Sequence, residues 1–233
     1  MKAAIMQPYF MPYIGYWQLI ASVDVFVVYD NIEYTKKGWF NRNRILEAGH
    51  DRLFTIPIKK DSDYLPVKER YLSDDSDKEN TRTLRIIENN YRKAPYFNEA
   101  FPVIKQCLTS LEKNLFEFIY NSIKTVANYL DIGTEIIISS SVDIDHTLKA
   151  EKKVLAICRA VHATTYINSI GGLELYDRDT FVSQGIELKF IKAKLTEYPQ
   201  FGQAFVPGLS IIDVLMFNSK DEAKELLKRY DLV

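Results

Sequence analysis

Apolar runs alternate with amphipathic segments along this chain, and their order predicts an α/β fold. Residues 2–6 and 24–29 are short apolar runs typical of buried strands. Between them, residues 7–13 contain two prolines and predict a loop, whereas apolar side chains recur at helical spacing in residues 14–23. This strand, loop, helix, strand order is a βαβ unit, which implies a parallel sheet with a right-handed crossover.

A β-hairpin and then a helical region follow this unit. Residues 41–46 and 52–58 predict two antiparallel strands joined by a turn at 47–50, and the polar residues 59–78 predict a loop. Three helical patterns come next, and Gly133 ends the last of them; they cover residues 77–91, 97–108 and 111–130.

The last hundred residues return to alternating strands and helices. The pattern predicts strands at 135–139, 164–167 and 187–191, the last one led into by residues 181–184, and helices at 149–161, 210–216 and 221–229. We find no linker, repeat or low-complexity tract. The sequence therefore predicts one α/β domain over residues 1–233, with a mostly parallel sheet opened by the βαβ unit, a β-hairpin, and a helical insertion at about 77–131.

Composition narrows the class of protein. The formal net charge of −1 argues against nucleic-acid binding through a global basic surface. The sequence contains no run of about 18 apolar residues, the length that a membrane span requires. The apolar stretch at the amino terminus is too short for a signal peptide, and Pro8 interrupts it. We therefore expect a cytoplasmic protein. Cys107 and Cys158 are too few for a disulfide framework or a zinc site, and we expect them to be buried packing residues.

The strongest chemical signal is the segment 30–44, DNIEYTKKGWFNRNR. It places four cations among aromatic and amide side chains: Lys36, Lys37, Arg42 and Arg44 with Trp39, Asn41 and Asn43. Guanidinium groups bind carboxylate or phosphate oxygens, amides both donate and accept, and rings stack on planar groups or sugars. This mixture predicts a site for an anionic, hydroxyl-rich small molecule. The alternative is an exposed basic hairpin anchored in the core by Trp39 and Phe40.

The predicted topology supports the same location. Gln7 and Asp30 follow the first two strands, and ligands of parallel sheets bind beyond the carboxyl ends of the strands. Tyrosines combine an apolar ring with a polar hydroxyl, so we also assign Tyr13, Tyr16 and Tyr34 to substrate binding.

Side chains alternate along a strand, so residues 41–44 cannot all face one pocket. We predict that Asn41 and Asn43 face one side and Arg42 and Arg44 the other, with one pair binding ligand and one pair structural. The asparagines are the ligand pair if Asp30 forms a salt bridge with Arg42 or Arg44.

A turn after the strand at 164–167 is a second candidate for binding. Ser169, Gly171 and Gly172 lie in this turn, where backbone amides could approach a phosphate or carboxylate. A tight turn at the exit of a strand explains the same residues equally well. Phosphate-loop and dinucleotide glycine motifs are absent from the sequence.

Few side chains are candidates for acid–base chemistry. His146 follows Asp143 and Asp145, which could form an acid–base or Mg²⁺ group or could cap the next helix. Asp213 lies three residues after Ser210, so a carboxylate and a hydroxyl share a helix face; a capping box is the alternative. We assign catalysis to Asp30, His146 and Asp213 and substrate binding to Ser210. No histidine pair has metal-ligand spacing, and no motif identifies a cofactor.

Two family resemblances extend these assignments. The turn at residues 12–16 loosely resembles that of the nucleotidyltransferase-like fold, although both histidines of its His-x-Gly-His signature are absent. The opening QPYFMPYIGYWQLIASVDVFVVYDNIEYTKKGWFNRNRI and the later NSIGG, LYDRDTF and PGLSIIDVL resemble the WbqC-like family nearly end to end. Many members of that family have His before Gln-Pro, where this chain has Met6.

The second resemblance implies a function. The family is associated with genes for surface polysaccharides, and its name comes from a proposed glycine transferase of O-antigen synthesis. It therefore implies N-acyl or N-aminoacyl (possibly glycyl) transfer to the amino group of a nucleotide-linked deoxyamino sugar. Asp30 or a neutral histidine could be the general base, and the amides at Gly171 and Gly172 could bind the oxyanion.

Two other functions remain open at this point. One is an ATP-dependent amide-forming ligase of nucleotidyltransferase-like fold, and the other is a non-catalytic sugar-nucleotide-binding or scaffold protein. The acyl donor is not identified by any motif: a thioester, a charged tRNA and a free acid with ATP all fit.

Overall fold

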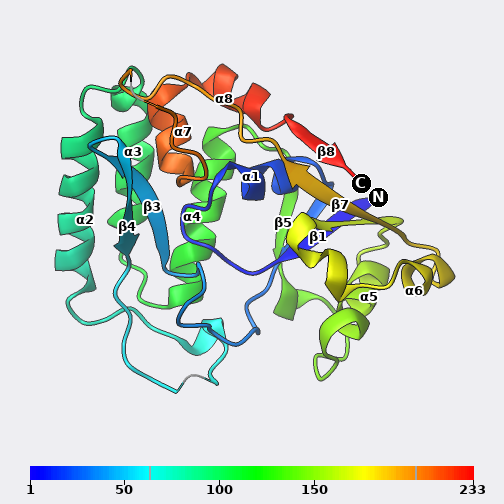
Figure 1. The fold of residues 1–233 in the computed structure, drawn as a ribbon. Coiled ribbons are helices and arrows are strands. Elements are labelled where there is room, and N and C mark those ends of the chain that lie inside the picture. The colour runs from blue at the N-terminus through cyan, green and yellow to red at the C-terminus, as the bar shows by residue number, and fades with distance from the viewer. Residues whose placement is uncertain (63, 203) are drawn as a thin grey trace.

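A computed structural model describes residues 1–62, 64–202 and 204–233, and its centre is a six-stranded sheet (Figure 1). The strand order is β5-β2-β1-β6-β7-β8, and every neighbouring pair is parallel except β7 and β8. The strands are β1 Lys2–Met6, β2 Val25–Val28, β5 Glu135–Ile138, β6 Thr165–Ser169, β7 Glu187–Ala193 and β8 Tyr230–Leu232. The mostly parallel sheet predicted from the sequence is therefore confirmed.

Helices cover both faces of this sheet because its central strands are apolar on both sides. Ala4 of β1 packs in one core together with α1 (Ile14–Ala21) and α4 (Leu115–Tyr129). Ala3 and Ile5 face the other way, into a second core with α5 (Ala150–Ala160) and α6 (Arg178–Ser183). The sheet therefore forms the middle of three layers.

The predicted hairpin forms a separate two-stranded sheet, β3 (Arg42–Glu47) and β4 (His50–Thr55). Its turn is shorter than predicted, because Ala48 and Gly49 alone occupy it with φ of 50° and 83°. The hairpin contributes Ile45 and Phe54 to the same core as the remaining helices, which are α2 Ser76–Tyr91, α3 Phe97–Leu108, α7 Ile211–Phe217 and α8 Lys220–Leu226. Figure 1 shows this group on one side of the molecule and α5 and α6 on the other.

The predicted element types hold, with differences in the bounds of two helices and with several short elements that were not predicted. The helix predicted at 111–130 begins at Leu115, because the side chain of Asn114 caps it by accepting from the amide of Glu117 at 3.2 Å. The helix predicted at 221–229 ends at Leu226, and β8 then pairs with β7. Neither α6 nor the 3-10 helix η1 (Val67–Glu69), which lies inside the predicted loop, was predicted.

Two further 3-10 helices follow strands at the edge where the candidate site lies. They are η2 (Ser139–Ser141), after β5, and η3 (Ile170–Leu175), after β6. Both cysteines are buried, as predicted, and burial raises the pKa of each thiol to about 12. No helix in the described part of the chain has the length and apolar content that a membrane crossing requires.

Candidate functional site

A cleft of about 770 Å³ opens at the carboxyl ends of β1, β2 and β6. The chain leaves β1 toward β2 on one side, while β6 occupies the other side, so the cleft lies at the point where the strand order reverses. Gln7 follows β1, Asn31 follows β2 and Ser169 ends β6, and all three line the cleft. We call it the switch-point cleft.

Lys153, Asn31 and His146 form a connected polar group in this cleft. The ammonium of Lys153, on α5, donates to Oδ1 of Asn31 at 2.9 Å, and Nδ2 of Asn31 lies 3.3 Å from Nδ1 of His146. An ammonium can only donate, so it fixes Oδ1 of Asn31 toward Lys153 and the NH₂ toward His146. Nδ1 of His146 is then the acceptor, and the neutral ring carries its proton on Nε2.

Lys153 is nine-tenths buried, with 9% of its surface exposed. Burial lowers its pKa; the charge of Asp30 raises it, and that of Lys68 lowers it further. The ammonium also lies 5.4 Å from the centroid of the Tyr29 ring, at a distance typical of cation–π contact.

Asp30 lies behind this group and does not contact the cleft directly. The residue is 3% exposed, and its carboxylate accepts from Oγ of Ser139 at 2.7 Å and the amide of Ser140 at 3.0 Å. Lys68 is the ammonium that pairs with it, at 3.7 Å. The condition under which the asparagines would be the ligand pair, a salt bridge from Asp30 to Arg42 or Arg44, is therefore not met, because both guanidiniums lie on the hairpin and bind other partners.

The turn from β6 into η3 forms the opposite wall. Ser169, Gly171 and Gly172 line the cleft, as does Asn168, whose Oδ1 accepts from the amide of Ser169 at 2.8 Å. A Cβ atom on Gly172 would lie 2.4 Å from Nδ2 of Asn168, whereas one on Gly171 would meet nothing closer than 4.0 Å. Glycine at 172 thus allows the side chain of Asn168 to approach the backbone closely within the wall.

Tyrosine rings complete the cleft. Tyr9, Tyr29 and Tyr176 line it, and burial raises the pKa of each phenol, so all three remain protonated donors at neutral pH. Tyr16 lies beneath them, fully buried, and donates to the carbonyl of Gln7 at 3.0 Å. Tyr16 therefore supports the loop after β1 from below.

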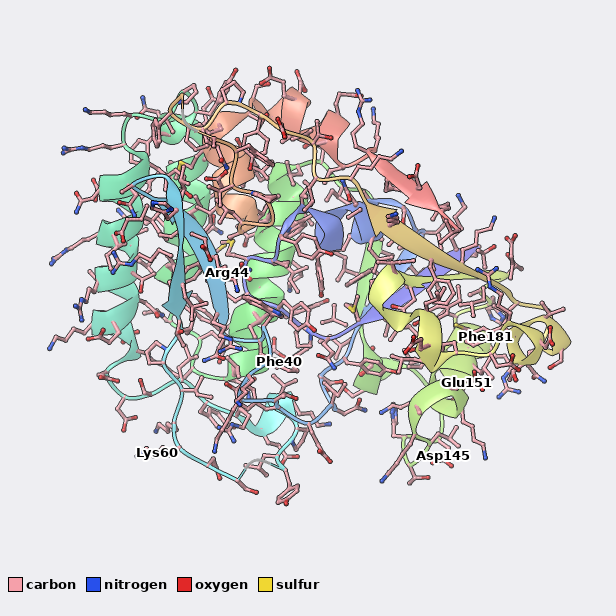
Figure 2. All side chains as sticks on the ribbon, viewed as in Figure 1. Phe40, Arg44, Lys60, Asp145, Glu151 and Phe181 are labelled. Carbon is pink, nitrogen blue, oxygen red and sulfur yellow. The ribbon has the colours of Figure 1, made fainter. Side chains whose placement is uncertain are left out.

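The basic segment that the sequence emphasised lies apart from the cleft. Trp39 is 38% exposed, and the guanidiniums of Arg42 and Arg44 lie 5.5 Å and 5.3 Å from its ring centroid. Arg44 also pairs with Asp51 at 3.3 Å across the hairpin. Figure 2 shows Arg44 on the hairpin and Glu151 of α5 in separate parts of the molecule. Lys36 and Lys37 are exposed nearby and do not line the cleft either.

The predicted alternation of residues 41–44 is confirmed, since both asparagines are buried and Arg44 is exposed. Their amides, however, bind within the fold. Asn41 donates to the carbonyl of Ile56 at 2.7 Å and accepts from the hydroxyl of Tyr34 at 2.8 Å. Asn43 donates to the carbonyl of Met11 at 2.7 Å. The asparagines hold the hairpin against the loop after β1, which gives them a structural role.

Asp213 belongs to a different buried cluster. Its carboxylate accepts from the hydroxyls of Tyr91 at 2.8 Å and Tyr198 at 2.7 Å and from Nε2 of Gln200 at 2.6 Å. Burial raises its pKa, although these three hydrogen bonds oppose the shift. The hydroxyl of Ser210 caps α7 by accepting from the amide of Ile212 at 3.3 Å, and the capping box with Asp213 does not form, because the Asp213 carboxylate is used by these three donors. We call Asp213 and its three donors the α7 cluster.

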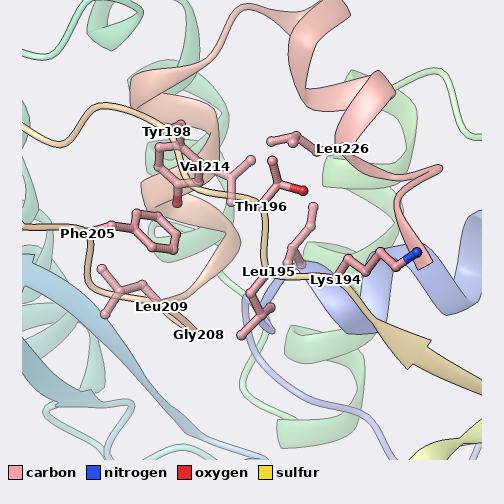
Figure 3. A pocket seen from close by; sticks show the side chains of 10 residues that line it. Lys194, Leu195, Thr196, Tyr198, Phe205, Gly208, Leu209, Val214 and Leu226 are labelled. Carbon is pink, nitrogen blue, oxygen red and sulfur yellow. The ribbon is translucent and has the colours of Figure 1, made fainter. Parts of the chain in front are cut away.

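The surroundings of the α7 cluster leave little room for a ligand. Tyr13 is 38% exposed, and its backbone forms an isolated antiparallel β-bridge with Ser210. The hydroxyl of Ser210 donates to the carbonyl of Met11 at 2.6 Å. A nearby pocket holds about 20 Å³, which is too small for a sugar, and Figure 3 shows its mostly apolar lining, including Tyr198, Phe205 and Leu226. Among the described residues, no group of three or more His, Cys, Asp or Glu side chains could hold a metal ion.

The structure thus brings five predicted site residues into one cleft and separates the others from it. Those in the cleft are Gln7, His146, Ser169, Gly171 and Gly172. Sequence analysis missed Asn31, Lys153 and Asn168. Asn31 follows the second strand and Asn168 begins the predicted turn, so strand ends were a usable signal. Lys153 lies inside an ordinary amphipathic helix, and its position in the sequence gave no signal.

Comparison with known proteins shows likeness along nearly the whole chain. A sequence model of the WbqC-like protein family matches residues 7–225, a range that includes Gln7, Asn31 and Lys153. Uncharacterized protein Rv1507c of Mycobacterium tuberculosis is 28% identical over 229 residues, which cover 97% of each chain. No solved structure matches. The likeness therefore extends along the whole chain, and the name of this relative states no activity.

Proposed function

The chain belongs to the WbqC-like protein family, and we propose that it is an N-acyl or N-aminoacyl (for example glycyl) transferase acting on a nucleotide-linked deoxyamino sugar. The observation that supports this proposal is the switch-point cleft. Its volume of about 770 Å³ lies within the range of small-molecule sites, and its walls combine tyrosine rings with a few hydrogen-bonding groups. Reaction on a nucleotide-linked sugar also fits the cytoplasmic location and the surface-polysaccharide pathway expected from the sequence.

The reaction needs an activated acyl donor, which is a thioester, an ester such as a charged tRNA, or an acyl phosphate. The neutral amine of the sugar attacks the acyl carbon and forms the new C–N bond. The bond from that carbon to the leaving group breaks, and its electron pair departs with the leaving group. One proton of the amine passes to the leaving group or to solvent, which completes the amide.

His146 has the geometry for one part of this reaction. Because Nδ1 accepts from Asn31, the neutral ring offers Nε2–H to the cleft, where it can donate to the developing oxyanion. Met6, which replaces the histidine of many family members, also lines the cleft. The proposal therefore assigns His146 the role of a donor. It assigns Asp30 and Asp213, both enclosed by their own hydrogen bonds, structural roles.

The test is amide formation by the purified protein. Uridine- and thymidine-diphosphate amino sugars are incubated with each donor class, and the product is followed by mass spectrometry. We expect His146→Ala to lower kcat by about 100-fold, the effect of losing one oxyanion donor. His50→Ala, at an exposed position in β4, is the matched control.

Each alternative function gives a different result. Acid-dependent ATP–pyrophosphate exchange identifies an amide-forming ligase. Sugar-nucleotide binding without amide formation from any donor class identifies a non-catalytic binding protein, and the absence of both binding and turnover overturns the proposal altogether.

A further inference from the structure

Lys153 carries a buried charge that forms no ion pair with any described carboxylate. In the described part of the chain, no carboxylate oxygen lies within 4.0 Å of its ammonium nitrogen, which donates to the neutral Oδ1 of Asn31 and lies near the ring of Tyr29. Buried charges in proteins are normally paired, because leaving water is costly for an ion without a partner. A cation left in this state at the wall of a cleft indicates a partner from outside the chain.

The nearby charges leave a positive excess. Asp30 is the adjacent carboxylate, and it is already engaged by Ser139, Ser140 and the ammonium of Lys68. Two ammoniums, Lys68 and Lys153, therefore surround one carboxylate. The other charged residues lining the cleft, Glu33 and Lys149, are exposed and opposite in sign, so they do not cancel this excess.

We infer that Lys153 is the anion subsite of the switch-point cleft and that it binds an oxyanion of the ligand, either a phosphate or a carboxylate. The hairpin cations Arg42 and Arg44 are not part of this subsite, because they stack on Trp39 and Arg44 pairs with Asp51. The identity of the ligand rests on the proposed function: the oxyanion is a phosphate of the nucleotide in the proposed transfer, or the carboxylate of a free acid in the alternative ligase reaction.

Isothermal titration with defined probes tests the subsite. Uridine diphosphate, thymidine diphosphate and glycine are titrated into the wild type, Lys153→Met, Lys152→Met and the double variant Arg42→Ala/Arg44→Ala. Lys152 precedes Lys153 on the same helix and is exposed, so it is the matched control. We expect Lys153→Met to weaken binding at least tenfold, the typical effect of losing one hydrogen bond to a charged group, and Lys152→Met to change it less than twofold.

The probes also distinguish the two sources of the oxyanion. Lys153-dependent binding of the diphosphates alone identifies the nucleotide phosphate, and Lys153-dependent binding of glycine alone identifies a carboxylate. The inference is overturned if the wild type binds none of the probes, if Lys153→Met and Lys152→Met bind equally, or if the hairpin double variant alone loses binding. Lys153-dependent binding without amide formation contradicts the proposed reaction but leaves the subsite intact.

Discussion

Two buried charges in this protein have opposite surroundings. The carboxylate of Asp213 in α7 accepts hydrogen bonds from Tyr91, Tyr198 and Gln200, so both of its oxygens have donors within the fold. The ammonium of Lys153 in α5 has one neutral oxygen, from Asn31, and an aromatic ring. A buried charged group whose hydrogen bonds all go to the protein's own donors has a structural role, whereas one that forms no ion pair at the wall of a cleft is available to a ligand.

The largest effect is expected from breaking the α7 cluster. Asp213→Leu leaves three buried donors without an acceptor, and we expect the free energy of unfolding to fall by about 3–5 kcal/mol. Chemical denaturation measures this loss. Asp221→Ala, at an exposed position in the first turn of α8, is the control and should change stability by less than about 0.5 kcal/mol.

The same cluster predicts a pH dependence. The pKa of Asp213 is raised by burial, so its contribution to stability is largest below the pKa of an unfolded aspartate and declines as pH rises through the folded pKa. Asp213→Asn cannot titrate and should lose this part of the pH dependence. A variant that keeps the wild-type curve of unfolding free energy against pH would contradict this reasoning.

The next effect concerns the wall of the cleft. Gly172→Ala places a Cβ atom 2.4 Å from Nδ2 of Asn168, and we expect a loss of about 1–3 kcal/mol together with weaker ligand binding. Gly171→Ala has its nearest neighbour at 4.0 Å and should be neutral or slightly stabilising. Thermal melting of the pair checks the difference, and equal melting temperatures would mean that the wall accommodates the methyl group freely.

Lys153→Met should have a smaller effect on stability, and of opposite sign. Burial lowers the pKa of Lys153 in the folded protein. The stability of the fold that depends on this residue is therefore fully present only at high pH, where the amine is neutral, and is lost as pH falls through the folded pKa. At neutral pH the charge therefore destabilises the fold. We expect unfolding to become harder by about 0–2 kcal/mol, with Lys152→Met near zero. A clear loss of stability specific to Lys153→Met would place this residue with Asp213 as a structural charge.

The smallest change in stability, about 0.5 kcal/mol in either direction, is expected for Asn31→Asp. A carboxylate has no donor for Nδ1 of His146, so the neutral ring should move its proton from Nε2 to Nδ1. It also supplies Lys153 with a counter-charge, which should weaken binding of anions. Nitrogen-15 NMR above about pH 8, where imidazoles are neutral, reads the tautomer directly. An unchanged tautomer would show that Asn31 does not orient His146.

The sequence by itself determined the fold and one edge of the site. Apolar runs of strand length and helices with one apolar face leave few ways to bury their surfaces, so the βαβ unit, the hairpin and the helices at 76–129 followed from pattern alone. Because ligands of parallel sheets bind beyond strand ends, Gln7 and the turn at 169–172 could also be placed. The strand β8 could not, since its three residues become a strand through pairing with β7.

Only the tertiary structure decided which polar residues are free to act. Asn41, Asn43 and Asp213 have the chemistry of site residues, but distant segments satisfy their hydrogen bonds. Lys153 resembles any lysine of an amphipathic helix until α5 packs on the sheet and carries it into the cleft beside Asn31, 122 residues away in sequence. The availability of a polar group depends on its neighbours in space, and for these residues those neighbours are set by packing between elements and not by the local sequence.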